Sequence, residues 1–469
     1  EDISRYGAHE TSLLNTSKAL NEIIEDSKLT NQKTISLVTG VPGAGKTLVG
    51  LNVANERKNI SKAENAVFLS GNGPLVTVLR EALARDRKRV ADTLEEKNEQ
   101  GKKFGISDAR REVKPTIQNV HHFRNDYLKS PDAPNEQVAV FDEAQRAWNT
   151  HQTSKFVKEK HDKPDFSMSE PHCLIDYMNR HNTWCSVVCL IGGGQEINTG
   201  EAGVSEWVET IKNNFPKWTI HYSDQITESD NYLKNKVLIE WIKSNGRQKN
   251  ELHLGVPVRS FRSEILSDFI ENLLKLKIEK AKNLFVALNK DYPIVLTRNS
   301  TIYKNWLNSK KRGTERTGVL VSANAKRLRP EGIDSENALS SKSDETKIAN
   351  WFLNPEQDVR SSLSLEIPST EFAIQGLELD WACLAWGGDF SLQNSDWVCQ
   401  KFIGHKWTNI GKEITKEYLL NTYRVLLTRA RQGLIIFIPN GDPYDTTRLS
   451  TRYDGTFEYL KSIGIPELD

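Results

Sequence analysis

A glycine-rich segment near the start of the chain has the residue types and spacing of a phosphate-binding loop. It reads Gly40-Val41-Pro42-Gly43-Ala44-Gly45-Lys46-Thr47 and directly follows the apolar run 35–38. In a strand, loop and helix of this kind, backbone N–H groups surround phosphate oxygens, and the positive end of the helix favours the anion. Lys46 is expected to reach the β- and γ-phosphates, and Thr47 to bind Mg²⁺. The residues predicted to contact the nucleotide here are Gly40, Gly43, Ala44, Gly45, Lys46, Thr47 and Leu48.

Two adjacent carboxylates, Asp142 and Glu143, follow the apolar run 138–141. This order predicts that they lie at the carboxyl end of a strand, where ligands bind in open α/β sheets. We expect Asp142 to share the Mg²⁺ with Thr47, and Glu143 to orient and deprotonate the water that attacks a γ-phosphate. The alternative is a pair of surface acids at a strand end. Together with the phosphate loop, the two acids favour hydrolysis of a nucleoside triphosphate.

A second glycine turn, Gly192-Gly193-Gly194-Gln195-Glu196, follows the apolar run 187–191. Glycines at a strand end allow backbone to approach a nucleotide closely. Gln195 is expected to sense the γ-phosphate by hydrogen bonding and to transmit its presence to a neighbouring surface. The alternative is an ordinary glycine turn.

With these three segments in this order, the chain resembles superfamily 1 helicases. Asp142-Glu143-Ala144-Gln145-Arg146 and 194–196 are similar to motifs of that superfamily's first domain. Four later segments are similar to motifs of its second domain, namely Phe261-Arg262-Ser263, 294–299, Gln375-Gly376-Leu377-Glu378 and 426–431. The resemblance implies two RecA-like domains that hydrolyse ATP with Mg²⁺ in the cleft between them.

The resemblance also implies roles for residues of the second half. Gly376 and Glu378 would bind the nucleotide through its ribose, and Arg262 and Arg429 would contact the γ-phosphate, with Arg429 as the arginine finger. A guanidinium from another domain neutralises charge in the transition state, with typical effects of ~10³–10⁵ in rate, and ties hydrolysis to domain closure. The alternative is that these are structural surface arginines, and Arg259 lies near enough to replace Arg262.

A closer resemblance is to a largely bacterial family of helicase-like proteins of unassigned function, related to the helicase-like half of Schlafen proteins. It depends on segments 68–75, 141–148, 369–381 and 423–431, and it covers roughly residues 30 to 469. In one respect the chain departs from superfamily 1, because only Gln32 lies upstream of the phosphate loop, close to it. Preference for adenine is therefore implied by the resemblance alone.

In the resembled motors a single strand of nucleic acid crosses both domains, held by amides, hydroxyls, basic groups and aromatic rings. The chain is nearly neutral, with 63 Lys and Arg against 62 Asp and Glu, so single-stranded DNA or RNA must meet a local basic surface. His121-His122 are more typical of a surface turn than of a metal site, because no third ligand is spaced nearby. The candidate nucleic-acid contacts are Ser70, Asn72, Thr116, His122 and Thr370.

Short apolar runs separated by helical patterns recur along the chain, and they predict the α/β class with parallel sheets covered on both faces. These strands and helices must position the candidate site residues. The motifs predict two tandem RecA-like domains of the P-loop NTPase type, 1–245 and 246–469. The first carries the phosphate loop, the acid pair, the Gly-Gln-Glu motif and a charged insertion at about 85–114, expected to be an exposed helical insertion or a mobile arm. The second carries the arginine motifs and a polar, loop-rich insertion at about 308–347.

Five cysteines without a C-x-x-C pair predict a reduced, intracellular and cytoplasmic protein rather than a zinc site. No apolar run approaches ~18 residues and no basic-then-apolar leader is present, which predicts a protein without a membrane span. The chain begins at Glu1, so an upstream segment is expected.

These features predict an ATP-dependent superfamily 1-type helicase or translocase acting on nucleic acid. The alternative is an ATP-gated regulatory or sensor module of a defence protein that does not unwind nucleic acid and has an upstream effector domain or a partner protein. Both alternatives use ATP and Mg²⁺ and the same candidate catalytic residues, which are Lys46, Asp142, Glu143, Gln195, Arg262 and Arg429.

Overall fold

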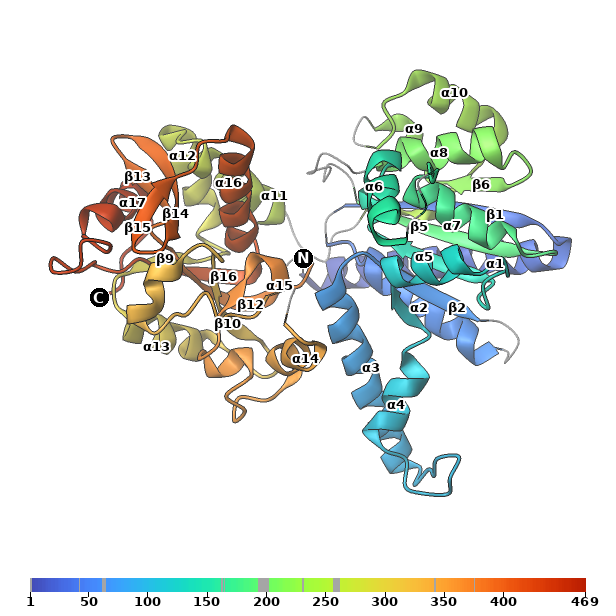
Figure 1. Cartoon of the computed structure of the whole chain (residues 1–469), viewed down its shortest axis with the longest axis horizontal. Coiled ribbons are helices and arrows are strands. Elements are labelled where there is room, and N and C mark those ends of the chain that lie inside the picture. The colour runs from blue at the N-terminus through green and yellow to red at the C-terminus, as the bar shows by residue number, and fades with distance from the viewer. Residues whose placement is uncertain are drawn as a thin grey trace. The chain divides into compact units, whose positions relative to one another are not determined.

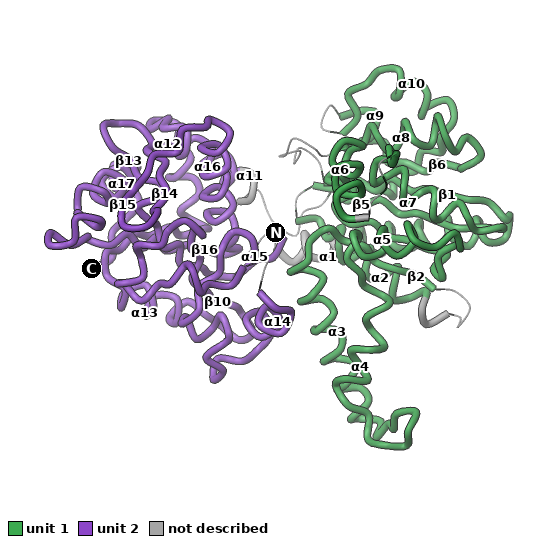
Figure 2. The backbone as a smooth tube through the Cα atoms, in the orientation of Figure 1, with its two compact units in different colours: residues 1–260 green, residues 261–469 purple. Residues whose placement is uncertain are grey.

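The computed structural model describes the chain in ten segments: 2–41, 43–60, 65–161, 163, 165–192, 202–229, 232–255, 262–340, 343–374 and 376–469. The chain divides into two compact units, Glu1–Ser260 and Phe261–Asp469 (Figure 2). No helix among the described residues has the length and apolar character needed to span a membrane.

Within its described residues, unit 1 is built on an eight-stranded parallel sheet of order β3-β2-β4-β5-β1-β6-β7, with β8 beside β1. Its strands are β1 (Lys33–Gly40), β2 (Ala66–Ser70), β3 (Ile117–Asn119), β4 (Val138–Asp142), β5 (Cys185–Gly192), β6 (Thr219–Tyr222), β7 (Arg247–Gln248) and β8 (His253–Leu254). Every residue of β2, β4 and β5 is buried, which confirms the expectation from their continuous apolar runs. The predicted α/β class is confirmed.

Helices cover both faces of this sheet (Figure 1). The helices of unit 1 are α1 (Asp2–Thr30), α2 (Lys46–Ile60), α3 (Gly73–Thr93), α4 (Ile106–Val113), α5 (Val120–Lys129), α6 (Thr150–His161), α7 (Glu170–Asn179), α8 (Gly203–Asn214), α9 (Gln225–Glu228) and α10 (Lys236–Asn245), with the short 3-10 helices η1 (Ala144–Arg146) and η2 (Asn250–Leu252). Val38 packs in one core with α1 and α2, whereas Ile35 and Leu37 pack in another with α5, α7 and α8. β1 therefore packs apolar side chains on both of its sides.

The charged insertion at 85–114 is a helical hairpin that projects from unit 1 as the end of α3 and α4 (Figure 1). Phe104 lies in a small core between the two helices, and the guanidinium of Arg87 is 4.6 Å from the centre of its ring. Arg87 also forms ion pairs with Glu96 at 2.6 Å and with Glu112 at 2.8 Å. Because many of these charges pair within the hairpin, they contribute to its own structure.

Within its described residues, unit 2 contains a five-stranded parallel sheet of order β11-β10-β12-β16-β9 and a separate antiparallel sheet, β13-β14-β15. Its strands are β9 (Ile294–Thr297), β10 (Thr317–Val321), β11 (Ser369–Thr370), β12 (Leu379–Ala385), β13 (Phe390–Gln393), β14 (Asp396–Ile403), β15 (Lys406–Asn409) and β16 (Ala430–Phe437). Its helices are α11 (Arg262–Leu274), α12 (Ile278–Leu288), α13 (Ser300–Lys310), α14 (Glu345–Leu353), α15 (Glu371–Ile374), α16 (Glu413–Leu427) and α17 (Thr451–Ser462), with the 3-10 helices η3 (Lys326–Glu331) and η4 (Ser362–Ser364).

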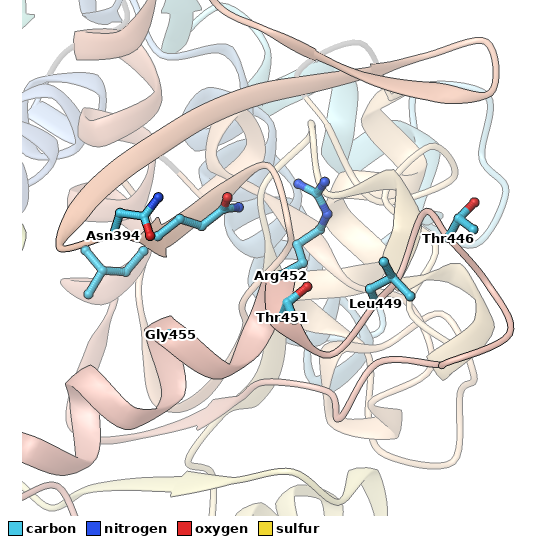
Figure 3. Close-up of a pocket in the computed structure, with 8 residues that line it drawn as sticks. Asn394, Thr446, Leu449, Thr451, Arg452 and Gly455 are labelled. Atoms are coloured by element: carbon cyan, nitrogen blue, oxygen red, sulfur yellow. The ribbon is translucent and has the colours of Figure 1, made fainter.

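A cavity of about 350 Å³ lies in unit 2 where the β13–β14 turn approaches the start of α17 (Figure 3). Its lining is Leu392, Gln393, Asn394, Thr446, Leu449, Thr451, Arg452 and Gly455. None of these residues belongs to a predicted motif.

Candidate nucleotide-binding site

The carboxyl ends of five neighbouring strands in unit 1 bring the predicted segments of the first half to one edge of the sheet. Strand pairing places Gly40 beside Gly192, and Ser70 between Asp142 and Asn119. Segments far apart in the sequence thus end at the same level. This edge is where open parallel sheets bind their ligands.

The phosphate loop makes its turn through two glycines with positive φ, Gly43 at 75° and Gly45 at 83°, a conformation that glycine adopts without steric cost. α2 then begins at Lys46, whose ammonium group donates to the carbonyl oxygens of Gly40 at 2.8 Å and Val41 at 3.2 Å. Burial lowers the pKa of Lys46, while the nearby Glu143 and Asp142 oppose that shift. The loop thus holds a half-buried amine at a helix N-terminus, an arrangement suited to phosphate.

β8 lies directly beside the strand that leads into this loop. Thr39 pairs with His253 and Gly40 with Leu254, and the Val41 N–H donates to the Leu254 carbonyl at 3.2 Å. A Cβ atom on Gly40 would come within 2.9 Å of Leu254 Cβ, so the close packing of β8 requires glycine there.

Thr47 and Asp142 meet as predicted from their motifs. The Thr47 hydroxyl donates to Asp142, with Oγ1 at 3.2 Å from Oδ1 and 3.4 Å from Oδ2. Burial, and then the neighbouring Glu143, raise the pKa of Asp142, which is 3% exposed. A hydroxyl and a carboxylate are the hard oxygen donors that Mg²⁺ prefers, and this ion usually completes its shell with water and substrate phosphates. Among the described residues, no cluster of three or more His, Cys, Asp or Glu is placed to hold a metal ion.

Glu143 contacts different neighbours from Asp142. Its backbone is left-handed, with φ 53° and ψ 46°, and η1 follows it directly. The Gln145 side-chain amide donates to Glu143 Oε2 and accepts from the Gly192 N–H at 3.0 Å. Arg146 lies on the same carboxylate, with Nε 3.7 Å from Oε2. Residue type and spacing do not predict these two contacts of Gln145, because they depend on how β4 and β5 are placed.

Some predicted site residues lie outside what the structure describes. Gln195 and Gln375 are outside the described residues, and so is Arg259. Arg262 is the first residue of α11, but its side chain is not described. Gly376 has φ 76°, a left-handed conformation that favours glycine at this turn.

The two predicted motifs that contain Glu378 and Arg429 lie side by side in unit 2. Leu379 at the start of β12 pairs with Ala430 at the start of β16, and the Leu379 N–H donates to the Arg429 carbonyl at 3.0 Å. Glu378 accepts from Arg431 Nε at 3.0 Å. The Arg429 guanidinium donates back to its own helix end, at 3.2 Å to the Val425 carbonyl. Parallel pairing of β12 and β16 thus brings Glu378 and Arg429 to one edge of the unit 2 sheet.

The candidate nucleic-acid contacts differ in how far they reach the surface. Ser70, Thr116 and Thr370 are buried, and the Thr370 hydroxyl donates to the Leu339 carbonyl at 2.9 Å. Asn72 is half-buried, and its side chain caps α3 by accepting from the Leu75 N–H. His122 is exposed in the first turn of α5. Asn72 and His122 are therefore the two of the five candidates whose side chains reach solvent.

Comparison with known proteins gives a family match over most of the chain. The model described as Schlafen group 3, DNA/RNA helicase domain matches residues 33–440. No curated protein sequence matches the chain.

Three solved structures are similar at low levels, and at these TM-scores they add no argument to the family match. The Pyrococcus furiosus Hef helicase domain is 12% identical, with a TM-score of 0.26, over 88% of this chain and 94% of that one. The DUF1998 helicase MrfA, bound to DNA and AMPPNP, is 12% identical with a TM-score of 0.29, over 97% of this chain and 51% of that one. The Sulfolobus solfataricus SWI2/SNF2 ATPase core, in complex with dsDNA, is 12% identical with a TM-score of 0.27, over 90% of this chain and 87% of that one.

Proposed function

The chain belongs to the Schlafen group 3 DNA/RNA helicase domain family, and from this membership we propose that it is an ATP-dependent helicase or translocase of the superfamily 1 type. The observation that carries the proposal is the meeting of the phosphate loop with the acid pair, through the contact of Thr47 with Asp142. Single-stranded DNA or RNA is the proposed partner, and ATP with Mg²⁺ the proposed cofactor pair.

In the proposed reaction each side chain has a separate task. The Lys46 ammonium exchanges its two carbonyl partners for β- and γ-phosphate oxygens and neutralises their charge. Thr47 and Asp142 would hold Mg²⁺, which when bound draws negative charge from the phosphates. Glu143 orients the attacking water and takes its proton. Arg429 stabilises the charge that spreads over the γ-phosphate as the bond to the leaving group breaks.

Two substitutions test the hydrolytic site. We expect Lys46→Ala to abolish ATP hydrolysis and weaken nucleotide binding, because it removes the phosphate-binding charge. Glu143→Gln should also abolish turnover but retain nucleotide, because only the base is lost. Phosphate release and binding of a non-hydrolysable ATP analogue measure the two effects.

Lys243→Ala and Glu240→Gln provide matched controls, since both side chains are exposed on α10 and belong to no predicted motif. Both controls should hydrolyse ATP at the rate of the unmodified protein. Normal turnover in Lys46→Ala or Glu143→Gln would contradict the assignment.

A further inference from the structure

Gln145 occupies a buried position between two parts of the candidate site. The residue is 1% exposed, and its side chain joins the end of β4 to the end of β5. Oε1 accepts from the Gly192 N–H at 3.0 Å, and Nε2 donates to Glu143 Oε2. A buried polar side chain with both ends of its amide bonded is rigidly held.

The partners determine which way round the amide lies. The backbone N–H of Gly192 can only donate, so it must face the carbonyl oxygen of Gln145. The amide nitrogen then faces Glu143, whose carboxylate accepts. A reversed amide would set donor against donor at one end and acceptor against acceptor at the other. Neither a carboxylate nor an apolar side chain at position 145 makes both bonds.

The Glu143 side chain is 38% exposed, and among the described residues its ion pair with Arg146 is longer, at 3.7 Å from Nε to Oε2. A partly exposed glutamate samples several rotamers unless a partner selects one. The bond from the buried Gln145 selects the rotamer in which Glu143 Oε2 lies beside the end of β5.

We propose that Gln145 is a positioning residue for hydrolysis, holding the Glu143 carboxylate in the orientation needed to accept the proton of the attacking water. The proposal rests on the proposed function, since it assigns Glu143 the role of base. Gln145 acts only through Glu143 and does not contact the nucleotide. Because one amide bonds both groups, movement of the backbone at Gly192 changes the position of the carboxylate.

The test compares Gln145→Met with the unmodified full chain. Methionine is close in length and removes both hydrogen bonds. Misplacement of a catalytic group by about 1 Å can cost roughly 100-fold in rate, so we expect kcat for ATP to fall by about that factor. The Kd for a non-hydrolysable ATP analogue should stay within about threefold, because the phosphate loop is untouched. Loss of nucleotide affinity with unchanged kcat would overturn the proposal.

Gln137→Met is the matched control. Gln137 directly precedes β4, at the opposite end of the strand from Asp142. The same substitution there should leave kcat unchanged. An equal loss of kcat at both positions would overturn the proposal, because it would reflect general weakening of β4.

A double variant separates positioning from a general structural effect. In a Glu143→Gln background the base is already absent, so Gln145→Met should cause no further loss of the residual rate. A further loss of about 100-fold would show that Gln145 acts independently of Glu143 and would overturn the proposal. If Gln145→Met does not fold, Gln145→Glu replaces it. That variant sets a carboxylate against Glu143, and normal kcat in it would overturn the proposal.

Failure of this inference differs from failure of the proposed function. If Glu143→Gln abolishes hydrolysis and Gln145→Met does not reduce it, only the inference about Gln145 is wrong. If Lys46→Ala and Glu143→Gln both hydrolyse ATP normally, the proposed function is wrong, and the positioning role is wrong with it.

Discussion

The left-handed backbone of Glu143 separates the contacts of two adjacent acids. A residue with a Cβ adopts this conformation at a cost of about 1–3 kcal/mol, and it persists where surrounding contacts determine it. Here the Arg146 N–H donates to the Glu143 carbonyl at 2.8 Å, and Trp207 Nε1 donates to the Ala144 carbonyl at 2.9 Å. As a result Asp142 bonds to Thr47, whereas Glu143 bonds to Gln145.

A methyl group at Gly192, at the end of β5, should disturb the position of the Glu143 carboxylate. A Cβ atom there would lie 3.1 Å from Gln145 Nε2, so this amide must shift by a few tenths of an ångström and move its bond to Glu143 Oε2, which would lie 3.4 Å from the same Cβ. We expect Gly192→Ala to lower kcat for ATP by about tenfold, a smaller effect than a 1 Å misplacement. Steady-state phosphate release without nucleic acid measures it.

Gly71→Ala is the control for this substitution. Gly71 follows β2 at the same edge of the sheet, and the nearest atom to its added Cβ would be Val120 Cγ1 at 3.9 Å. This variant should hydrolyse ATP normally. Equal activity of Gly192→Ala and the unmodified protein would show that the contact tolerates displacement.

At the scale of single residues, the sequence predicts contacts that follow from type and spacing. Thr47 and Asp142 belong to motifs with defined places on a strand or helix, and they meet. The bridge through Gln145 was not predicted, because it depends on the placement of Gly192 relative to β4. Burial of the Thr370 hydroxyl was not predicted either, because it depends on a carbonyl 31 residues away.

At the scale of elements, continuous apolar runs identified strands better than alternating ones. β4 and β5 coincide with such runs, because every one of their residues is buried and burial on both faces selects apolar side chains. In β14 only Cys399 is buried, and the other residues are half-buried or exposed, so no continuous apolar run predicts this strand. Packing across turns forms this sheet, as with Phe390 and Trp397, whose ring centres are 4.3 Å apart.

A buried carboxylate joins three elements of unit 2. Asp389 follows β12, and it accepts from the hydroxyl of Ser322, which follows β10, at 2.7 Å. It also accepts from the Tyr423 hydroxyl of α16 at 2.8 Å. Burial raises the pKa of Asp389 from 3.8 to about 6, despite both hydrogen bonds. The folded state therefore binds a proton here more tightly than the unfolded chain does.

This raised pKa predicts that unit 2 loses stability as pH rises. Because the folded pKa lies above the unfolded value, the loss begins near pH 4 and is complete above about pH 6. The contribution is about 3 kcal/mol, at 1.36 kcal/mol for each pKa unit. Asp389→Asn should lack this contribution, so its free energy of unfolding should change less with pH than that of the unmodified protein. Denaturant unfolding followed by tryptophan fluorescence at pH 4 to 7 measures it.

Asp291→Asn serves as the control, since Asp291 is exposed in the same unit. Its pH dependence should run parallel to that of the unmodified protein. If the free energy of unfolding of Asp389→Asn also runs parallel to that of the unmodified protein, the Asp389 carboxylate does not titrate between pH 4 and 7.

At the scale of the whole molecule, net charge gives little attraction for nucleic acid. The formal net charge is +1, so steering by the field of the molecule is weak. The proposed binding would then depend on local groups, among which we propose the exposed His122. The near-neutral composition predicts that nucleic acid must meet a local surface. It does not predict which of the candidate side chains reach that surface.

Stimulation by nucleic acid tests the helicase or translocase proposal. We expect single-stranded DNA or RNA to raise the ATPase rate, and the stimulation to fall as salt rises, because phosphate contacts release counterions. ATPase assays with and without an oligonucleotide, at 50 and 200 mM salt, are the measurement. A rate unchanged by either nucleic acid would contradict a translocating motor and would favour the ATP-gated sensor that the sequence offers as an alternative.

The pairing of β8 with β1 has a consequence for dividing the chain. His253 and Leu254 supply the hydrogen-bonded neighbour of Thr39 and Gly40, and the Leu254 carbonyl satisfies the Val41 N–H. A fragment that stops at residue 245 would lack β8. The end of β1 would then lose its paired strand, and the Val41 N–H would lose its acceptor. A minimal fragment that preserves the loop must therefore extend through at least Gly255.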